Sequence, residues 1–273
     1  IIGHKGLFFY TKKGSIISTV DLPTTEIIEP FFVELGVYAV DNQEKRNILP
    51  QDLRRVALLL GFSGGAVDVY SHLRFHTLVA TQTGNIVLMV AQIAEKQDNF
   101  LPRLTSIIVF SIGFVLGIAY KQWAQTPYWR IFAMMLMLIA CLVLPFLPSD
   151  QLLFKIIALS FGTGLLMLTF TGSKIETVPY TIMMTSGNYR RMLMSWYHYA
   201  TSAAKNPQDK RDVVNYTIIV LSFMLGALTA AVAYIWLKDL TIWLVALALV
   251  LVMIFYAIEI ARADHYVKEI KGR

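Results

Sequence analysis

Long apolar stretches separated by short polar segments dominate this chain. The most uniformly apolar stretch, residues 240–258, has no charged residue and is long enough to cross a bilayer, which takes about 20 helical residues. Comparable apolar windows occupy residues 56–73, 104–123, 131–147, 152–170 and 214–236. Because an open strand would leave its amides unpaired in lipid, these segments are expected to be helices. The pattern predicts an all-α polytopic membrane protein with at least six crossings.

Two polar triplets, Thr83-Gly84-Asn85 and Ser186-Gly187-Asn188, recur at matching places in the two halves of the chain. Each follows a Thr-containing apolar run and precedes two further apolar segments. We interpret this as an internal duplication, with membrane repeats at 54–148 and 149–262. Each repeat is expected to contain four helical segments, the second of which carries the triplet. Such repeats usually place function at their interface.

The third segments of the two repeats also match in sequence. Gly113 and Gly117 align with Ser222 and Gly226. Small residues four positions apart allow helix backbones to approach closely, and we expect packing within the chain rather than a dimer interface.

Two topologies agree with the apolar pattern. The triplet segments either cross fully, giving eight crossings and parallel repeats, or are broken and re-entrant, giving six crossings and inverted repeats. Glycine at the centre of each triplet permits a break. The stretch from Thr177 to Asn188 is too short for a full crossing, whereas the first copy is long enough, so the choice stays open.

The distribution of basic residues predicts the orientation in the membrane. The chain carries a net charge of +6, and its Lys and Arg residues gather before the first apolar window, around residues 190–211 and at the C-terminal end. Basic residues tend to stay cytoplasmic, which indicates membrane topology rather than contact with nucleic acid. Residues 1–53 are expected to form a cytoplasmic N-terminal segment with a short hairpin over residues 7–20. Residues 263–273 are expected to form a cytoplasmic tail.

The residues around the first triplet resemble a known family. The runs Gly64-Gly65-Ala66-Val67-Asp68-Val69-Tyr70 and Thr81-Gln82-Thr83-Gly84-Asn85-Ile86-Val87-Leu88 are similar to the YoaK-like family of bacterial integral membrane proteins. That family, a domain of unknown function, has a second Met-Thr-Gly-Asn copy, which is Met184-Thr185-Ser186-Gly187-Asn188 here. The resemblance covers about residues 54–262. It implies the membrane fold and implies no activity.

Asp68 and the two triplets are the candidate functional residues. Asp68 lies about 12 residues into the first helix, where an ionisable side chain usually faces a cavity or a partner. The asparagines add donors and acceptors, and the neighbouring Thr and Ser add hydroxyls. We assign a substrate site between the repeats to Asp68, Tyr70, Gln82, Thr83, Gly84, Asn85, Thr185, Ser186, Gly187, Asn188 and Arg190.

Each of these residues also has a structural interpretation. The triplets resemble helix-packing motifs with Asn as an interhelical bridge, and Asp68 could be hydrogen-bonded to a neighbouring helix. Arg190 and Arg191 are more typical of a lipid interface than of a substrate site.

A metal site is the weaker chemical alternative. Asp68, His72 and His76 have i, i+4, i+8 spacing, which can place ligands on one helix face. Arg74 lies between the histidines, however, and no second cluster of ligand residues follows. We predict neither a metal nor another cofactor.

The sequence favours a small-solute transporter or channel, and it favours a non-enzyme. The alternatives are a membrane-embedded metal-dependent enzyme using Asp68, His72 and His76, or a structural or signalling membrane subunit. The expected partners are the lipid bilayer and an unidentified small solute, without nucleic acid, and a homo-oligomer is left open. The expected location is the cell membrane, with multiple passes and both termini cytoplasmic.

Overall fold

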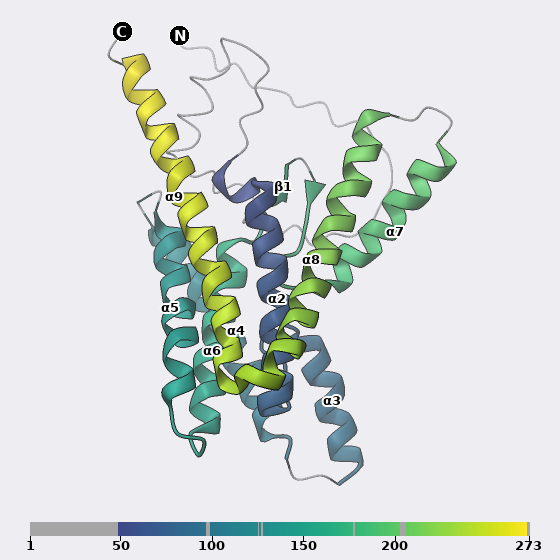
Figure 1. Ribbon diagram of the computed structural model, residues 1–273, viewed down its shortest axis with the longest axis vertical. Helices are drawn as coiled ribbons and strands as arrows, with labels where there is room; N and C mark the ends of the chain where they lie inside the picture. The colour runs from purple at the N-terminus through teal and green to yellow at the C-terminus, as the bar shows by residue number, and fades with distance from the viewer. Residues whose placement is uncertain are drawn as a thin grey trace, which may run out of the picture.

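A computed structural model describes residues 49–96, 99–124, 126, 128–176, 178–202 and 206–271, with side chains up to residue 262. The predicted N-terminal hairpin lies outside these residues. The described chain is almost entirely helical (Figure 1). The helices of its central bundle are α2 (Arg54–Phe75), α4 (Leu101–Trp123), α5 (Trp129–Val143), α6 (Leu152–Thr169), α8 (Pro207–Leu237) and α9 (Trp243–Lys271).

The remaining elements connect these helices. They are η2 (Pro50–Asp52), α3 (Gln82–Ala94), η3 (Leu144–Phe146), α7 (Ser186–Thr201), η4 (Lys238–Ile242) and a two-stranded antiparallel hairpin of β1 (Lys174–Ile175) and β2 (Val178–Pro179).

Five helices in the described chain are long and apolar enough to cross a membrane, as judged by length and composition. They are Arg54–Phe75, Leu101–Trp123, Trp129–Phe146, Leu152–Thr169 and Pro207–Arg262. The last of these is a bent pair, because α8 and α9 run in opposite directions on either side of η4 (Figure 1). The bend occurs at Lys238, whose backbone has a positive φ of 49°. These helices confirm the predicted all-helical class and indicate a multi-pass membrane protein.

The bundle has two ends, which we name after the Arg54 and η4 segments that lie there. Helices α2, α5 and α8 run from the Arg54 end to the η4 end, and α4, α6 and α9 run back (Figure 1). The start of α2 and the end of α9 therefore lie at the same end. Residues 263–271, expected to form a tail, continue α9 as helix.

Helices α3 and α7 differ from the others because they are not among these membrane spans and lie beside the bundle (Figure 1). Helix α2 ends at the η4 end, but the following backbone turns back to reach Asp68, two turns inside α2. Helix α3 starts there and returns to the η4 end. The chain after α6 likewise turns back from the Arg54 end, reaching Gly64 at Met183 before α7 begins.

The tightest packing is between α2 and α8 and between α4 and α6, and glycines allow it. A Cβ atom added to Gly65 or Gly226 would collide with the backbone of the other helix of the α2–α8 pair. Gly164 and Gly113 have the same relation in the α4–α6 pair. Such close backbone approach is typical of membrane helices.

The glycine contacts confirm packing within the chain. Gly113 faces the Phe161 carbonyl of α6, and Gly226 faces the Phe62 carbonyl of α2.

Candidate functional site

Asp68 binds the backbone that leads into α3. Its Oδ1 accepts hydrogen bonds from the amides of Val79 at 3.1 Å, Ala80 at 2.8 Å and Thr81 at 3.4 Å. Its Oδ2 accepts a hydrogen bond from the Thr81 hydroxyl at 2.5 Å. These amides precede α3, whose N-cap is Thr81, and therefore have no partner within that helix, and a carboxylate is favourable near the positive end of a helix. Asp68 therefore holds the loop against α2 at mid-depth.

Asn85 closes the same loop from the other side. Its Oδ1 accepts from the Leu78 amide at 2.8 Å, and its Nδ2 donates to the Leu78 carbonyl at 2.5 Å. The Thr77 hydroxyl adds a hydrogen bond to Oδ1 at 3.2 Å. A side-chain amide is suited to this position because it carries a donor and an acceptor together.

Asn188 makes the equivalent contact before α7. Its Oδ1 accepts from the Thr181 amide at 2.9 Å, and its Nδ2 donates to the Thr181 carbonyl at 2.7 Å. A further bond from Nδ2 reaches the Met184 carbonyl at 2.9 Å. In both halves the triplet asparagine therefore binds both backbone groups of the residue seven positions earlier. We call these two arrangements the Asn85 clamp and the Asn188 clamp.

A buried polar network extends from the Asn85 clamp into α4 and α6. The Gln82 side chain donates to the Val79 carbonyl at 2.8 Å, and the Ser106 hydroxyl donates to the Leu78 carbonyl at 2.8 Å. Ser160 of α6 donates to Ser106 at 2.9 Å. Sequence reasoning missed both serines. The available signal was a hydroxyl within each of the apolar windows 104–123 and 152–170.

The two clamped loops reach α2 within one turn of each other. Ala80 lies against Asp68, and the Met183 backbone lies against Gly64, where a Cβ atom would collide with it. Four residues of helix rise by about 6 Å. The loop tips are apolar and buried, and consist of Val79, Ala80, Ile182 and Met183. The triplets are therefore brought close to one level of the bundle, with aliphatic side chains at the tips.

The structure divides the remaining predicted site residues among several environments. Thr83, Ser186 and Arg190 are exposed, and Gly84, Thr185 and Gly187 are half-buried. Tyr70 is buried, but its ring packs on Phe75 and Tyr234 rather than on either clamp. Asp68, Gln82 and Asn85 are the predicted residues that share one hydrogen-bonded cluster, and Asn188 forms its own clamp.

The proposed metal ligands do not converge. Helix α2 ends at Phe75, and His76 has a left-handed backbone as its C-cap. Both histidines are exposed, whereas Asp68 is buried and bonded to the loop. Across the described part of the chain, no group of three or more His, Cys, Asp or Glu residues could hold a metal ion.

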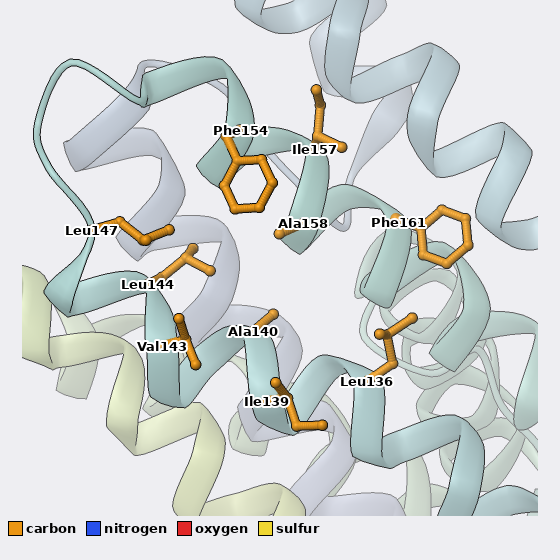
Figure 2. A pocket seen from close by; sticks show the side chains of 10 residues that line it. All are labelled: Leu136, Ile139, Ala140, Val143, Leu144, Leu147, Phe154, Ile157, Ala158 and Phe161. Carbon is orange, nitrogen blue, oxygen red and sulfur yellow. The ribbon is translucent and has the colours of Figure 1, made fainter.

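A groove of about 320 Å³ lies between α5 and α6 rather than at the clamps (Figure 2). Its lining side chains are all apolar and consist of Leu136, Ile139, Ala140, Val143, Leu144, Leu147, Phe154, Ile157, Ala158 and Phe161. Such a lining matches hydrocarbon and offers no hydrogen bond to a polar solute.

Another buried polar group lies at the Arg54 end. Arg130 is buried and donates to the Thr169 carbonyl at 3.1 Å and to the Tyr256 hydroxyl at 3.2 Å, which joins α5, α6 and α9. Nearby, Asp52 accepts a hydrogen bond from the Lys174 amide at 2.6 Å. Burial raises the pKa of the Asp52 carboxyl to about 6, although Lys174 and Arg130 oppose the shift.

These features define a polytopic helical membrane protein with two clamped loops at mid-depth. A family model described as "Protein of unknown function (DUF1275)" matches residues 56–255, and the chain belongs to this family. The YoaK-like resemblance of the triplets is consistent with that match. No curated protein and no solved structure matches the chain.

Proposed function

We propose that the chain is an inverted-repeat protein of the cell membrane, with both termini cytoplasmic. In this proposal α2, α3, α4 and α5 correspond to α6, α7, α8 and α9. The glycine contacts support the correspondence. Gly65 of α2 packs on Phe223 of α8, and Gly164 of α6, the counterpart of α2, packs on Phe110 of α4, the counterpart of α8. The paired asparagine clamps support it independently. Because α2 and α6 run in opposite directions, the repeats are inverted and α3 and α7 are re-entrant.

The function that fits this arrangement best is transport or permeation of a small solute. The observation that carries this proposal is that two clamped loops enter from opposite ends and reach α2 within one turn. Transporters with inverted repeats commonly bind substrate at mid-membrane between broken helices. In the arrangement seen here, Val79, Ala80, Ile182 and Met183 close the path.

The polar surface of the proposed path belongs mainly to the first repeat. If Gly65 is aligned with Gly164 and Gly113 with Gly226, Asp68 aligns with Met167. In the same alignment Ser106 aligns with Ile219, and Ser160 aligns with Gly61. A Cβ atom on Gly61 would lie 3.1 Å from Ile219 Cδ1, so this contact is apolar. We therefore place the substrate contacts at Asp68, Gln82, Asn85, Ser106 and Ser160. The second repeat would supply a largely apolar wall.

The test is flux through proteoliposomes containing the full chain. Swelling is followed by light scattering with glycerol, urea, sodium formate and sodium chloride as probes. We expect at least one probe to enter faster than in empty liposomes. Ser106→Ala combined with Ser160→Ala should alter that rate while leaving the unfolding midpoint near the native value. Ser111→Ala, which changes an exposed serine of α4, is the matched control.

A structural or signalling membrane subunit is the second candidate. The observation in its favour is that Asn85 and Asn188 direct their hydrogen bonds to their own chain, as packing motifs would. Equal swelling of loaded and empty liposomes for every probe would support this candidate over transport.

A further inference from the structure

Lys155, in the first turn of α6 at the η4 end, is an unusually buried charged residue. Its side chain is 1% exposed. Within the described residues its Nζ makes no hydrogen bond, and its ion-pair partner Asp239 lies 3.8 Å away at Oδ2. A buried ammonium group is costly unless it is both paired and hydrogen-bonded.

The Asp239 carboxylate is already bound by another cation. Arg74 donates to Asp239 Oδ1 at 2.6 Å through Nε and to Oδ2 at 3.3 Å through a terminal nitrogen. This two-bond geometry is the preferred one between Arg and a carboxylate. Two cations thus share one carboxylate, and the cluster has a surplus positive charge.

Two neutral donors in the same region also have no hydrogen-bond partner among the described residues. They are the hydroxyls of Tyr70 and Thr241, both on side chains no more than 1% exposed. Tyr70 lies within electrostatic range of Asp239 and Arg74, and Thr241 is two residues beyond Asp239 in η4. The cluster therefore combines a surplus cation with hydroxyl donors, and an acceptor with negative charge would satisfy all of them.

We propose that Lys155, Arg74, Tyr70 and Thr241 form a binding site for a small anion at the η4 end of the bundle. Arg74 and Asp239 provide access, since their side chains are 25% and 27% exposed. The ligand chemistry is a monovalent anion, which is either a free halide or carboxylate or the phosphate of an anionic lipid. The site does not depend on solute transport, because binding at one end requires no path across the bundle.

The experiment measures the unfolding midpoint of the full chain in detergent, with sodium gluconate replaced by chloride, bromide or acetate at constant ionic strength. A free anion should raise the midpoint saturably, by roughly 5 °C at a hundredfold excess over its Kd. A second series uses phosphatidylcholine nanodiscs with and without phosphatidylglycerol, in gluconate. A shift in that series without a shift in detergent assigns the site to a lipid phosphate.

Variants localise the effect to the cluster. Lys155→Met should abolish the anion-dependent shift. Tyr70→Phe and Thr241→Val should each raise the half-saturating concentration roughly tenfold, because a hydrogen bond to a charged group is lost. These two conservative variants provide the test if Lys155→Met does not fold. Lys96→Met, which removes an exposed lysine at the same end, is the control and should behave as native.

The inference is overturned if neither series shifts the midpoint, or if the Lys155→Met, Tyr70→Phe and Thr241→Val proteins keep the native anion dependence. Loss of flux with an intact anion shift would count against transport alone. Loss of the shift with intact flux would count against this site alone.

Discussion

Asn85 and Asn188 show what a single side chain contributes to this fold. Each binds the amide and the carbonyl of one residue seven positions earlier, and both side chains are buried. The loops before α3 and α7 have few backbone partners of their own, so these asparagines satisfy groups that lipid could not. The triplet is therefore a device that holds an irregular backbone inside an apolar bundle.

Replacing either asparagine by alanine should destabilise the protein by about 2–3 kcal/mol, because the amide of Leu78 or Thr181 loses its acceptor and the asparagine's other hydrogen bonds are lost, although the Leu78 carbonyl keeps the Ser106 hydroxyl. Unfolding of Asn85→Ala and Asn188→Ala in detergent, followed by circular dichroism against temperature, measures this. Asn99→Ala, at an exposed turn, serves as the control and should change little. Native-like midpoints in both clamp variants would show that the loops are held by other contacts.

Asp52 should make stability depend on pH. Its pKa rises from 3.8 to about 6 in the folded chain because the carboxyl is buried. A carboxyl whose pKa is raised on folding stabilises the protein fully below pH 3.8 and loses that contribution as the pH rises through 6. At about 1.4 kcal/mol per pKa unit the loss is at most about 3 kcal/mol.

The measurement is the unfolding midpoint between pH 4 and pH 7 for the native chain and for Asp52→Asn. The native midpoint should fall over this range, and the variant should show a flatter profile. A native profile that rises toward pH 7, with no difference from the variant, would contradict a raised Asp52 pKa.

At the scale of elements, the helix pairs α2–α8 and α4–α6 depend on backbone contact at glycine. A Cβ atom at Gly226 would meet the carbonyl of Phe62, and one at Gly113 would meet the carbonyl of Phe161. A backbone carbonyl cannot rotate away as a side chain can, so the helices themselves would have to separate.

Gly226→Ala and Gly113→Ala should therefore each cost about 1–3 kcal/mol or more. Gly187→Ala is the matched substitution, because the nearest atom to its Cβ is Thr181 Oγ1 at an ordinary 3.4 Å. That change should be neutral or slightly stabilising, since alanine is the better helix former. The three variants are compared by the fraction of folded protein that remains after detergent extraction. Equal fractions in all three would argue against backbone contact at Gly226 and Gly113.

At the scale of the whole molecule, the six helices of the bundle and the two helices beside it, α3 and α7, predict which loops share a membrane face. Residues Asn99, Asp150 and Lys238 all lie at the η4 end, whereas Asn206 lies at the Arg54 end (Figure 1). With eight full crossings, Asn99 and Asp150 would instead lie on the same face as Asn206.

Single cysteines at Asn99, Asp150, Lys238 and Asn206 distinguish these topologies. The native Cys141 is buried and should stay unlabelled. A membrane-impermeant maleimide applied to intact cells should label positions 99, 150 and 238, with position 206 labelled only after permeabilisation. Labelling of 238 alone would favour eight crossings and remove the basis for inverted repeats.

The long helices were predictable because each apolar window must be helical in lipid. The windows at 104–123 and 152–170 nearly coincide with α4 and α6. Asp68 was predicted as a substrate-site residue, with a hydrogen bond to a neighbouring helix as the structural alternative, and its backbone partners were not foreseen. Those partners are backbone amides of residues 79–81, and backbone amides have no sequence signature. Lys155 was missed because its partner Asp239 is 84 residues away along the chain.

The amino-acid sequence by itself determined the helical class, the membrane setting and the two matching Gly-Asn motifs, since each follows from local composition and spacing. Tertiary structure alone decided that α3 and α7 begin at mid-depth, that Ser106 meets Ser160, and that Lys155 and Arg74 share Asp239. The physical reason is that hydrophobicity acts residue by residue along a helix. Hydrogen bonds and ion pairs depend instead on which distant segments the folded bundle brings within about 3–4 Å.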